Sequence, residues 1–312
     1  MKRVFTLILT VLTLFSLASC APASGMPKDA HVFTDALGNT VYLSSDDKIA
    51  ACHASFADAW LLAGGELVGA TADAADEHGL DIGDAKIIGT AKTVYTENIV
   101  ASGATVAFLS ADLAAHLTLQ KTLESLGIRP LYFRIDTFAD YALLMSHFCA
   151  VTGRDDLYEK HVTEVGARID AILSKIPAGE TRTVLLMRAY SSGIKAKSDD
   201  NLAGRILSVY GMANIADAHP SLLEDMSLEH ILTEDPDFIF VLTMGNEESA
   251  LLYLRENIEN NPAFAGLSAV KNGAYHILPK ELFHHKPNER WDESYEYLAK
   301  ILYPEIFSAD EA

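Results

Sequence analysis

The stretch RDDLYEKHVTEVGARIDAILSKIP (residues 154–177) decides the predicted fold. Mostly apolar side chains recur at helical spacing from about Asp155 to Ile176, charged residues lie between them, and no proline interrupts the run before Pro177. The recurring positions are Leu157, His161, Val165, Ile169, Ile172 and Ile176. The pattern predicts one long helix over residues 154–177, which connects the segments on its two sides.

Short apolar runs alternate with helix-like segments on both sides of this stretch. Before it the strand-like runs are KIAAC (48–52), ELVGA (66–70), KIIG (86–89), TVAFL (105–109) and RPLYF (129–133), preceded by a predicted hairpin in HVFTDALGNTVYL (31–43). After it the series resumes with RTVLLMR (182–188), FIFVL (238–242) and AYHIL (274–278). Such alternation favours an α/β fold with mostly parallel sheets, and predicts two lobes, over residues 32–153 and 178–312, joined by the helix.

The first twenty residues, MKRVFTLILTVLTLFSLASC, have the pattern of an export signal. Lys2 and Arg3 precede an apolar stretch that is too short to be interpreted first as a membrane span. The tetrad LASC resembles the lipobox of bacterial lipoproteins, which predicts a signal peptide over residues 1–19, lipidation of Cys20 and a tether over residues 20–31. An ordinary signal peptide with a chance cysteine is the alternative.

Charge and cysteine content exclude some classes of function. The chain has 24 Lys and Arg against 43 Asp and Glu, a net charge of −19, so nucleic acid is not an expected partner. Cys52 and Cys149 remain beside Cys20, without a CxxC pair, so neither a disulfide framework nor a structural zinc site is predicted. Whether Cys52 and Cys149 are bonded to each other stays open.

An internal echo links the two predicted lobes. ENIVASGATVAFL (97–109) and EHILTEDPDFIFV (229–241) align without a gap, 132 residues apart, with Glu first, Ile third and Phe twelfth in each. Each predicts a short helix, opened by Glu97 or Glu229, that leads into a buried strand. Two unrelated helix–strand units can share this pattern, but its position in both lobes suggests pseudo-symmetry.

Several local patterns, in this order, resemble the substrate-binding lipoproteins of ABC importers that take up iron–siderophore complexes, haem and vitamin B12. They are GGELVGAT, IIGTAKTVYTENI, the linker helix, SLEHILTEDPDFIFV, NPAFAGLSAVKNGAYHILP and KPNERWDESYEYLAKILYP. The resemblance implies two Rossmann-like lobes with a ligand cleft between them, a non-enzymatic binder without a cofactor of its own, and a lipid-anchored position outside the bacterial cytoplasm. It also implies a membrane permease with its ATPase as partners, with Glu97 and Glu229 docking on the permease. A carboxylate in the first turn of a helix is also favoured by the helix dipole, which is the simpler explanation of each glutamate.

The cleft of such a fold is lined by loops at the carboxyl ends of the strands, and these loops supply the candidate ligand contacts. RAYSSGIKAK (188–197) is predicted to be one loop carrying Arg188, Tyr190 and Lys195. Arg binds carboxylate or catecholate oxygens in bidentate fashion, and Tyr stacks on a flat ligand or ligates ferric iron. An anionic iron chelate or the propionates of haem would suit this loop, whereas a solvated loop is the alternative.

Histidine, tyrosine and methionine are the side chains that ligate haem iron, which selects His53, Tyr95, Met244 and His284. KELFHHK (280–286) adds Phe283 and contains the pair His284 and His285. Adjacent side chains of an extended segment point to opposite sides, so only His284 is expected to face the cleft. His284 and His53 are the candidates for an axial contact, and no metal site of the protein itself is predicted.

Two other functions remain as alternatives. One is a binder of a free metal ion or an oxyanion, although the eleven histidines are scattered along the chain. The other is an exported enzyme that acts on a metal chelate with a related two-lobed fold. The expected function is capture of an iron complex (siderophore or haem) or a corrinoid between the lobes.

Overall fold

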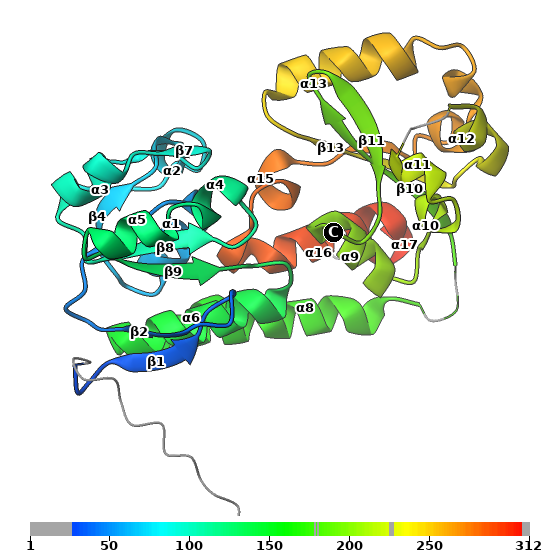
Figure 1. Ribbon diagram of the computed structural model, residues 1–312. Coiled ribbons are helices and arrows are strands. Elements are labelled where there is room, and N and C mark those ends of the chain that lie inside the picture. Colours follow the sequence, from blue (N-terminus) through cyan, green and yellow to red (C-terminus); the bar gives the residue numbers. More distant parts are fainter. Residues whose placement is uncertain (1–26, 178, 180, 225–227, 308–312) are drawn as a thin grey trace, which may run out of the picture.

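The computed structural model describes residues 27–307, with the exception of residues 178, 180 and 225–227 (Figure 1). The predicted signal peptide and Cys20 lie outside the described residues. None of the helices in the described part of the chain has the length and apolar character needed to cross a bilayer.

The N lobe contains a parallel sheet of five strands in the order β5-β4-β3-β8-β9. The strands are β3 (Ile49–Ala51), β4 (Leu67–Ala70), β5 (Lys86–Ile87), β8 (Val106–Ser110) and β9 (Arg129–Phe133). The helices are α1 (Ala54–Leu62), α2 (Ala72–Asp76), α3 (Thr96–Ser102), α4 (Ala114–Leu117), α5 (Gln120–Ser125) and α6 (Phe138–Thr152). The predicted hairpin is confirmed as β1 (His31–Thr34) and β2 (Thr40–Leu43), and a small hairpin of β6 (Gly89–Thr90) and β7 (Thr93–Val94) precedes α3.

The C lobe has a mostly parallel sheet in which β10 lies beside β13 and β13 beside β14. Its strands are β10 (Thr183–Tyr190), β11 (Gly193–Lys197), β12 (Ala213–Asn214), β13 (Phe238–Thr243) and β14 (Tyr275–Ile277). Its longer helices are α9 (Leu202–Val209), α12 (Leu228–Glu234), α13 (Glu247–Leu254) and α16 (Trp291–Leu302). The shorter ones are α10 (Ile215–Ala218), α11 (Ser221–Glu224), η2 (Arg255–Glu259), η3 (Phe264–Gly266), α14 (Ser268–Lys271), α15 (Lys280–Phe283), η4 (Asn288–Arg290) and α17 (Pro304–Phe307).

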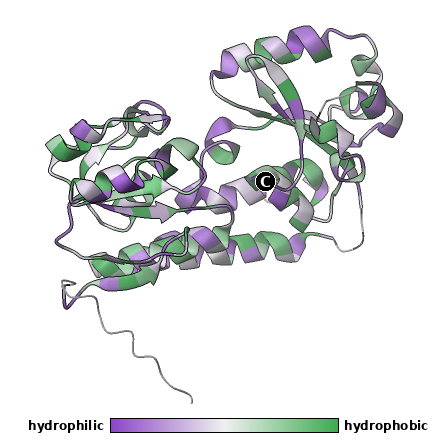
Figure 2. Cartoon of the chain, in the orientation of Figure 1, coloured by the Kyte–Doolittle hydropathy of each residue, from purple (hydrophilic) through white to green (hydrophobic). Residues whose placement is uncertain are grey.

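A helical run from Asp155 to Lys175 connects the two sheets, as the sequence predicts. It consists of α7 (Asp155–Tyr158), a π-helical turn η1 (Glu159–Thr163) and α8 (Glu164–Lys175). Gly153, with φ 69°, ends α6 just before this run, and α16 packs along α8. Figure 1 shows the run beneath both lobes, and Figure 2 shows hydrophobic and hydrophilic residues alternating along it, as expected for a helix with one buried face.

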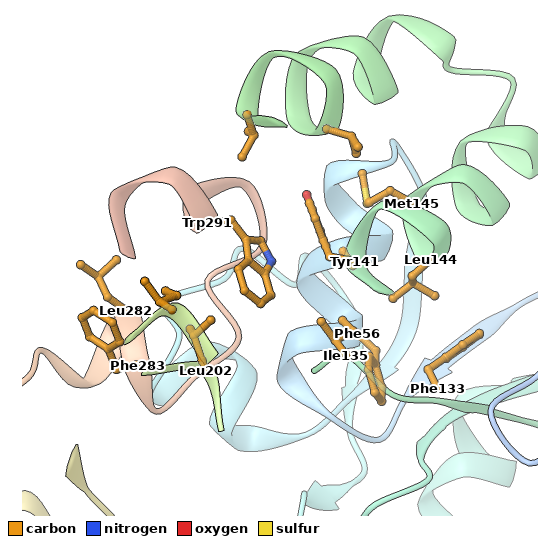
Figure 3. Close-up of a cluster of buried hydrophobic side chains, with 14 of the residues drawn as sticks. Phe56, Phe133, Ile135, Tyr141, Leu144, Met145, Leu202, Leu282, Phe283 and Trp291 are labelled. Atoms are coloured by element: carbon orange, nitrogen blue, oxygen red, sulfur yellow. The ribbon is translucent and has the colours of Figure 1, made fainter. Parts of the chain in front are cut away.

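One cluster of buried apolar side chains extends from the N lobe into the C lobe beneath the space between them. Figure 3 shows Trp291 of α16 beside Tyr141 of α6, with Leu282 and Phe283 on one side and Phe56 on the other. Trp291 and Tyr141 are among the largest fully buried side chains of the described residues. Because both lobes contribute to one core, their mutual arrangement depends on packing as well as on the linker helix.

The internal echo corresponds to a structural repeat. The helix–strand pair α3 and β8 in the N lobe matches α12 and β13 in the C lobe, and each strand lies next to the first strand of its sheet, β3 or β10. Gly103 ends α3 with φ 77°, and Asp235, 132 residues later, has φ 41° directly after α12. The two lobes therefore share a left-handed helix end at equivalent positions, which supports the predicted pseudo-symmetry.

Candidate ligand site between the lobes

Three of the predicted ligand residues lie near the points where the strand order of each sheet reverses. In the N lobe β3 and β8 are adjacent, but the chain continues from β3 to β4 on one side and from β8 to β9 on the other. In the C lobe β10 and β13 have the same relationship. Such points are the usual ligand crevices of doubly wound sheets. His53 lies two residues after the end of β3, Arg188 lies near the end of β10, and Met244 directly follows β13. His53 of the N lobe lowers the pKa of His285, and Arg188 lowers the pKa of His284, so residues from both lobes lie in one region.

Direct contacts join the two lobes in this region. The ring of His78, which follows α2 in the N lobe, meets the ring of His285 in the C lobe with centroids 4.1 Å apart. Lys280 Nζ lies 3.6 Å from Glu77 Oε2, and Lys286 Nζ lies 3.6 Å from Asp136 Oδ1. These three pairs join residues 280–286, which the sequence predicts to line the cleft, to the N lobe.

The expectation that His284 and His285 point to opposite sides is wrong, because their segment is not extended. His284 follows α15 with helical backbone angles (φ −99°, ψ −47°), and both backbone N–H groups donate to the carbonyl oxygen of Lys280. The two rings lie 5.0 Å apart, and His285 reaches the N lobe. The sequence analysis expected only His284 to face the cleft, and it did not select His285 or His78 as contacts.

Four histidines of this region share an environment that favours the neutral imidazole. Burial, with smaller contributions from neighbouring imidazoles and lysines, lowers the pKa of His53 to about 4, of His284 to about 4 and of His285 to about 3. Burial also lowers the pKa of His78, against the opposing influence of Asp73 and Glu77. At neutral pH these rings are uncharged and keep a nitrogen lone pair, which is the form that binds a metal or accepts a hydrogen bond.

His53 has one ring nitrogen committed to the fold. It occupies the N-cap of α1, where Nδ1 accepts a hydrogen bond from the backbone N–H of Ser55 at 3.3 Å. His116 is a further histidine near this end of the sheet, and both of its ring nitrogens are used. Its Nδ1 accepts from the backbone N–H of Ser110, and its Nε2 lies 2.8 Å from the carbonyl oxygen of Ala91. His53 therefore has Nε2 left for a ligand, whereas His116 supports the loops.

The prediction that residues 188–197 form one loop is wrong. Arg188 and Tyr190 belong to β10, and Lys195 belongs to β11, in a tight antiparallel hairpin. Arg188 is the direct cross-strand partner of Lys195, so the two cationic side chains project from the same face of the hairpin. Tyr190, two residues after Arg188, shares that face. The pairing of β10 with β11 thus places Arg188, Tyr190 and Lys195 on one face of the hairpin, whereas the predicted loop placed them only near one another in the sequence.

Arg188 and Lys195 have no ion-pair partner among the described residues. Arg188 is half-buried and close enough to His284 to lower the pKa of that imidazole. Lys197, on the same strand as Lys195, is by contrast paired with Asp200. Like charges directly opposite each other in a sheet repel. Asp200, which is paired with Lys197, is the nearby carboxylate, and Arg188 helps to lower its pKa, so it offsets this repulsion only in part.

The remaining predicted ligand residues differ in their positions. Met244 is half-buried at the end of β13, where its N–H donates to the carbonyl oxygen of Ala189. Tyr95 is the N-cap residue of α3 and is 47 % exposed, with its ring close to Gly89. Phe283 is 4 % exposed and packs edge-on against Tyr297 inside the C lobe. The assignment of Phe283 as a ligand contact is therefore corrected to a core residue.

Glu97 and Glu229 are both exposed, each in the first turn of its helix, α3 or α12. Figure 1 shows α3 toward the outer end of the N lobe and α12 toward the outer end of the C lobe. Both carboxylates are thus accessible to solvent. Each also lies at the favourable end of a helix dipole.

Cysteine chemistry and resident metal sites were also open in the sequence. Cys52 and Cys149 are separate buried thiols, and burial raises the pKa of Cys52 to about 12 and of Cys149 to about 11. Within the described residues, no group of three or more His, Cys, Asp or Glu side chains is arranged to hold a metal ion.

A cavity of about 240 Å³ lies between the lobes, lined by Asp136 and Thr137 from one side and by α9, Trp291 and Tyr295 from the other.

Comparison with known proteins identifies the family. Residues 57–282 match the model of a family described as periplasmic binding protein, and the chain belongs to this family. A curated relative from Bacillus subtilis (strain 168), YhfQ, is named as an ABC transporter substrate-binding lipoprotein. It is 28 % identical over 135 residues, which cover 40 % of this chain and 41 % of that protein.

Solved structures share the fold at low sequence identity. An ABC transporter substrate-binding protein from Listeria monocytogenes EGD-e is 17 % identical, with a TM-score of 0.65 over 83 % of this chain and 99 % of that one. Staphylococcus aureus SirA, solved with staphyloferrin B, is 15 % identical, with a TM-score of 0.67 over 87 % and 98 %. A periplasmic heme-binding protein from Pseudomonas aeruginosa is 18 % identical, with a TM-score of 0.66 over 83 % and 94 %. These similarities establish the predicted α/β fold of two lobes.

Proposed function

We propose that this chain is the substrate-binding subunit of an ABC importer and captures an anionic iron chelate, a siderophore complex or haem, between its lobes. Membership of the periplasmic binding protein family supports the binding role. SirA with staphyloferrin B and the heme-binding protein from Pseudomonas aeruginosa, which share the fold, support the ligand class.

The unpaired Arg188–Lys195 pair is the observation that carries this proposal. The chain has a net charge of −19, yet these two cations face each other across a hairpin without an ion-pair partner in the described part of the molecule. A carboxylate, catecholate or propionate bound between them would replace their repulsion by charge-assisted hydrogen bonds, and Arg188 offers bidentate geometry. An anionic ligand therefore fits the C-lobe wall of the crevice.

The neutral imidazoles suit the other part of such a ligand. His284 and His285 lie beside Arg188 and His78, and their low pKa values keep their nitrogen lone pairs free at neutral pH. His53 Nε2 and the thioether of Met244 are further donors near the ends of β3 and β13. A corrinoid or a haem would use one such side chain as an axial contact, whereas a saturated siderophore complex would accept hydrogen bonds only.

Delivery to a membrane permease would follow capture. Glu97 and Glu229 lie at equivalent positions of the two lobes and would dock on cationic residues of the permease, whose ATPase drives import. The LASC tetrad would anchor the chain through Cys20 on the outer face of the cell membrane or its periplasmic side. The name of the relative YhfQ, a substrate-binding lipoprotein, supports this location.

The absorbance spectrum of the protein purified from its own host tests the ligand class. A Soret band identifies haem, a charge-transfer band identifies a siderophore complex, and corrin bands identify a corrinoid. Affinity for the ligand that the spectrum identifies is then measured for Arg188→Ala, Lys195→Ala and Lys197→Ala by quenching of tryptophan fluorescence.

We expect a loss of about tenfold or more for Arg188→Ala and a smaller loss for Lys195→Ala, since losing a charged hydrogen bond costs about 1.5–3 kcal/mol. Lys197→Ala is the matched control, because Lys197 lies on the same strand and already has Asp200 as partner. Equal affinity in all three variants would contradict the proposal. A colourless protein that retains zinc or manganese would favour the free-metal alternative, and turnover of a chelate would favour an enzyme.

A further inference from the structure

Asn288 is an unusual residue at the junction of the two lobes. Its side chain is completely buried, and its backbone has φ 48°, one of only two non-glycine residues with positive φ among the described residues. Its Nδ2 donates to the carbonyl oxygen of Ser55 at 3.0 Å and to Asp58 Oδ2 at 2.6 Å. The bonds join η4, just after the segment that carries His284 and His285, to α1, whose N-cap is His53. One amide therefore connects the two sides of the crevice.

The site of this amide contains two half-buried carboxyl groups, Asp58 and Glu289, and several unpaired polar atoms. Burial and, to a smaller extent, the nearby carboxyl of Glu289 raise the pKa of Asp58 to about 7, although the hydrogen bond from Asn288 opposes this effect. Burial also raises the pKa of Glu289. Asn288 Oδ1 and Ser55 Oγ are buried without a hydrogen-bond partner in the structure. A proton on Asp58 would remove one of the two charges and supply a donor next to the acceptor Asn288 Oδ1.

Several elements around Asp58 carry groups that affect its protonation or that of Glu289. Tyr141 of α6 faces Asp58 and Glu289, and its pKa is raised by burial and by both carboxyls. Arg290 and Lys160 lower the pKa of Glu289, whereas Glu293 raises it. η1, which packs against η4, also carries the buried His161, whose pKa is lowered by burial and by Lys160. Titratable groups near Asp58 are thus Tyr141, His161, Glu289 and Glu293, with Lys160 and Arg290 as the permanent cations.

We propose that Asn288 and protonated Asp58 form an inter-lobe latch, and that loss of the Asp58 proton loosens the segment carrying His284 and His285. In the latched form Asn288 Nδ2 donates to Asp58, and the acidic hydrogen of Asp58 lies beside Asn288 Oδ1. When the proton leaves to solvent, an ionised Asp58 faces Glu289 in a half-buried site, which disfavours the contact between η4 and α1. Asn288 is a positioning residue, since it fixes the segment that carries His284 and His285 and does not itself contact a ligand. Its role in ligand capture rests on the proposed function, in which these histidines contact the ligand.

Trp291 provides a readout that needs no ligand. It lies three residues after Asn288, is 1 % exposed, and is one of only two tryptophans of the chain, so Trp60→Phe leaves it as the single emitter. In that background we expect the Trp291 emission to show a transition with a midpoint near pH 7. Asp58→Asn should abolish the transition, and Glu289→Gln should move its midpoint to lower pH because a like charge is removed. His161→Gln is the control for the nearby imidazole and should leave the midpoint in place.

The position of the histidines is measured separately by nuclear Overhauser effects between the ring protons of His78 and His285. Asn288→Gly should weaken this signal, although glycine tolerates the positive φ of this position. Lys286→Gln removes another, more exposed inter-lobe pair and should retain the signal.

A pH transition that persists in Asp58→Asn, or the absence of any transition, would overturn the latch. An unchanged signal between His78 and His285 in Asn288→Gly would also overturn it, because the positive φ of the turn would then be sufficient to explain why this position is Asn288. Neither measurement involves a ligand, so both results stay the same if the proposed iron-chelate ligand proves wrong. Conversely, a failed latch leaves the affinity tests on Arg188 and Lys195 unaffected.

Discussion

The imidazole rings of His78 and His285 meet between the lobes with their centroids 4.1 Å apart, 207 residues apart in the sequence. Each ring belongs to a different lobe, and both are neutral near pH 7 because burial and neighbouring cations lower their pKa values. A neutral pair allows close approach, whereas two imidazolium ions would repel each other. The arrangement makes the contact between the lobes sensitive to acid.

We expect His285→Gln to reduce the acid lability of the fold. The folded pKa of His285, about 3, lies below the unfolded value of 6.5, so the unfolded chain binds more protons between these limits. Stability contributed by neutral His285 is therefore complete above pH 6.5 and is lost as pH falls toward 3, with a slope of up to about 1.4 kcal/mol per pH unit for one proton. Urea unfolding at pH 7, 6, 5 and 4 measures this slope. A slope that is unchanged in His285→Gln would contradict the expectation.

The pseudo-symmetric helix ends can be tested at Asp235 and Gly103. We expect Asp235→Ala to cost about 1–3 kcal/mol, because alanine tolerates φ 41° poorly and the hydrogen bonds from Ser268 N–H and Oγ to the carboxylate are lost. Gly103→Ala should cost about 1–2 kcal/mol for backbone conformation alone, since nothing lies within 4 Å of an added Cβ. Asp235→Asn, which tolerates the left-handed region, should cost less than Asp235→Ala in thermal unfolding. Equal stability of the two Asp235 variants would show that φ is unimportant there.

Gly65 is a packing requirement of the N lobe. A Cβ on residue 65 would lie 2.0 Å from the indole of Trp60, whose Nε1 donates to the carbonyl oxygen of Glu66 at 2.9 Å. We expect Gly65→Ala to destabilise the fold by about 1–3 kcal/mol, with a changed Trp60 emission spectrum, because the ring must move. Gly266→Ala is the matched control, because no atom lies within 4 Å of the added methyl group. Similar melting temperatures for both variants would rule out the clash.

The two thiols of the described structure should be unreactive in the native state. Both side chains are buried, and burial raises their pKa values to about 12 for Cys52 and about 11 for Cys149, so little thiolate forms at pH 8. In a Cys20→Ser chain we expect no reaction with Ellman's reagent until denaturant is added, and two equivalents afterwards. Recovery of no thiol after denaturation without reductant would instead indicate a disulfide.

Docking on a permease predicts a separation of uptake from binding. Glu97→Ala combined with Glu229→Ala should abolish cellular uptake of the iron chelate while ligand affinity stays within about twofold, since both carboxylates are exposed and outside the crevice. Glu248→Ala, another exposed carboxylate in the first turn of a helix, is the control and should retain uptake. Loss of ligand binding in the double variant would refute the docking role.

The sequence by itself determined the α/β class, the linker helix and the repeated helix–strand unit, because each depends on local periodicity. Residues 155–175 form a helix as their 3.6-residue pattern requires, and all five strands of the parallel N-lobe sheet lie in or next to the predicted apolar runs. The left-handed position shared by Gly103 and Asp235 lies within the aligned segments, but nothing in the letters Gly and Asp marked them as equivalent.

Only the tertiary structure decided which polar side chains meet. The strand pairing of β10 with β11 placed Arg188 opposite Lys195, and a helical turn in place of an extended segment put His284 and His285 on one side. The bond between Asn288 and Asp58 joins residues 230 positions apart, and no periodicity carries information over that distance. Local patterns fix elements through backbone geometry, whereas sites depend on the packing of whole lobes, which a single sequence does not reveal.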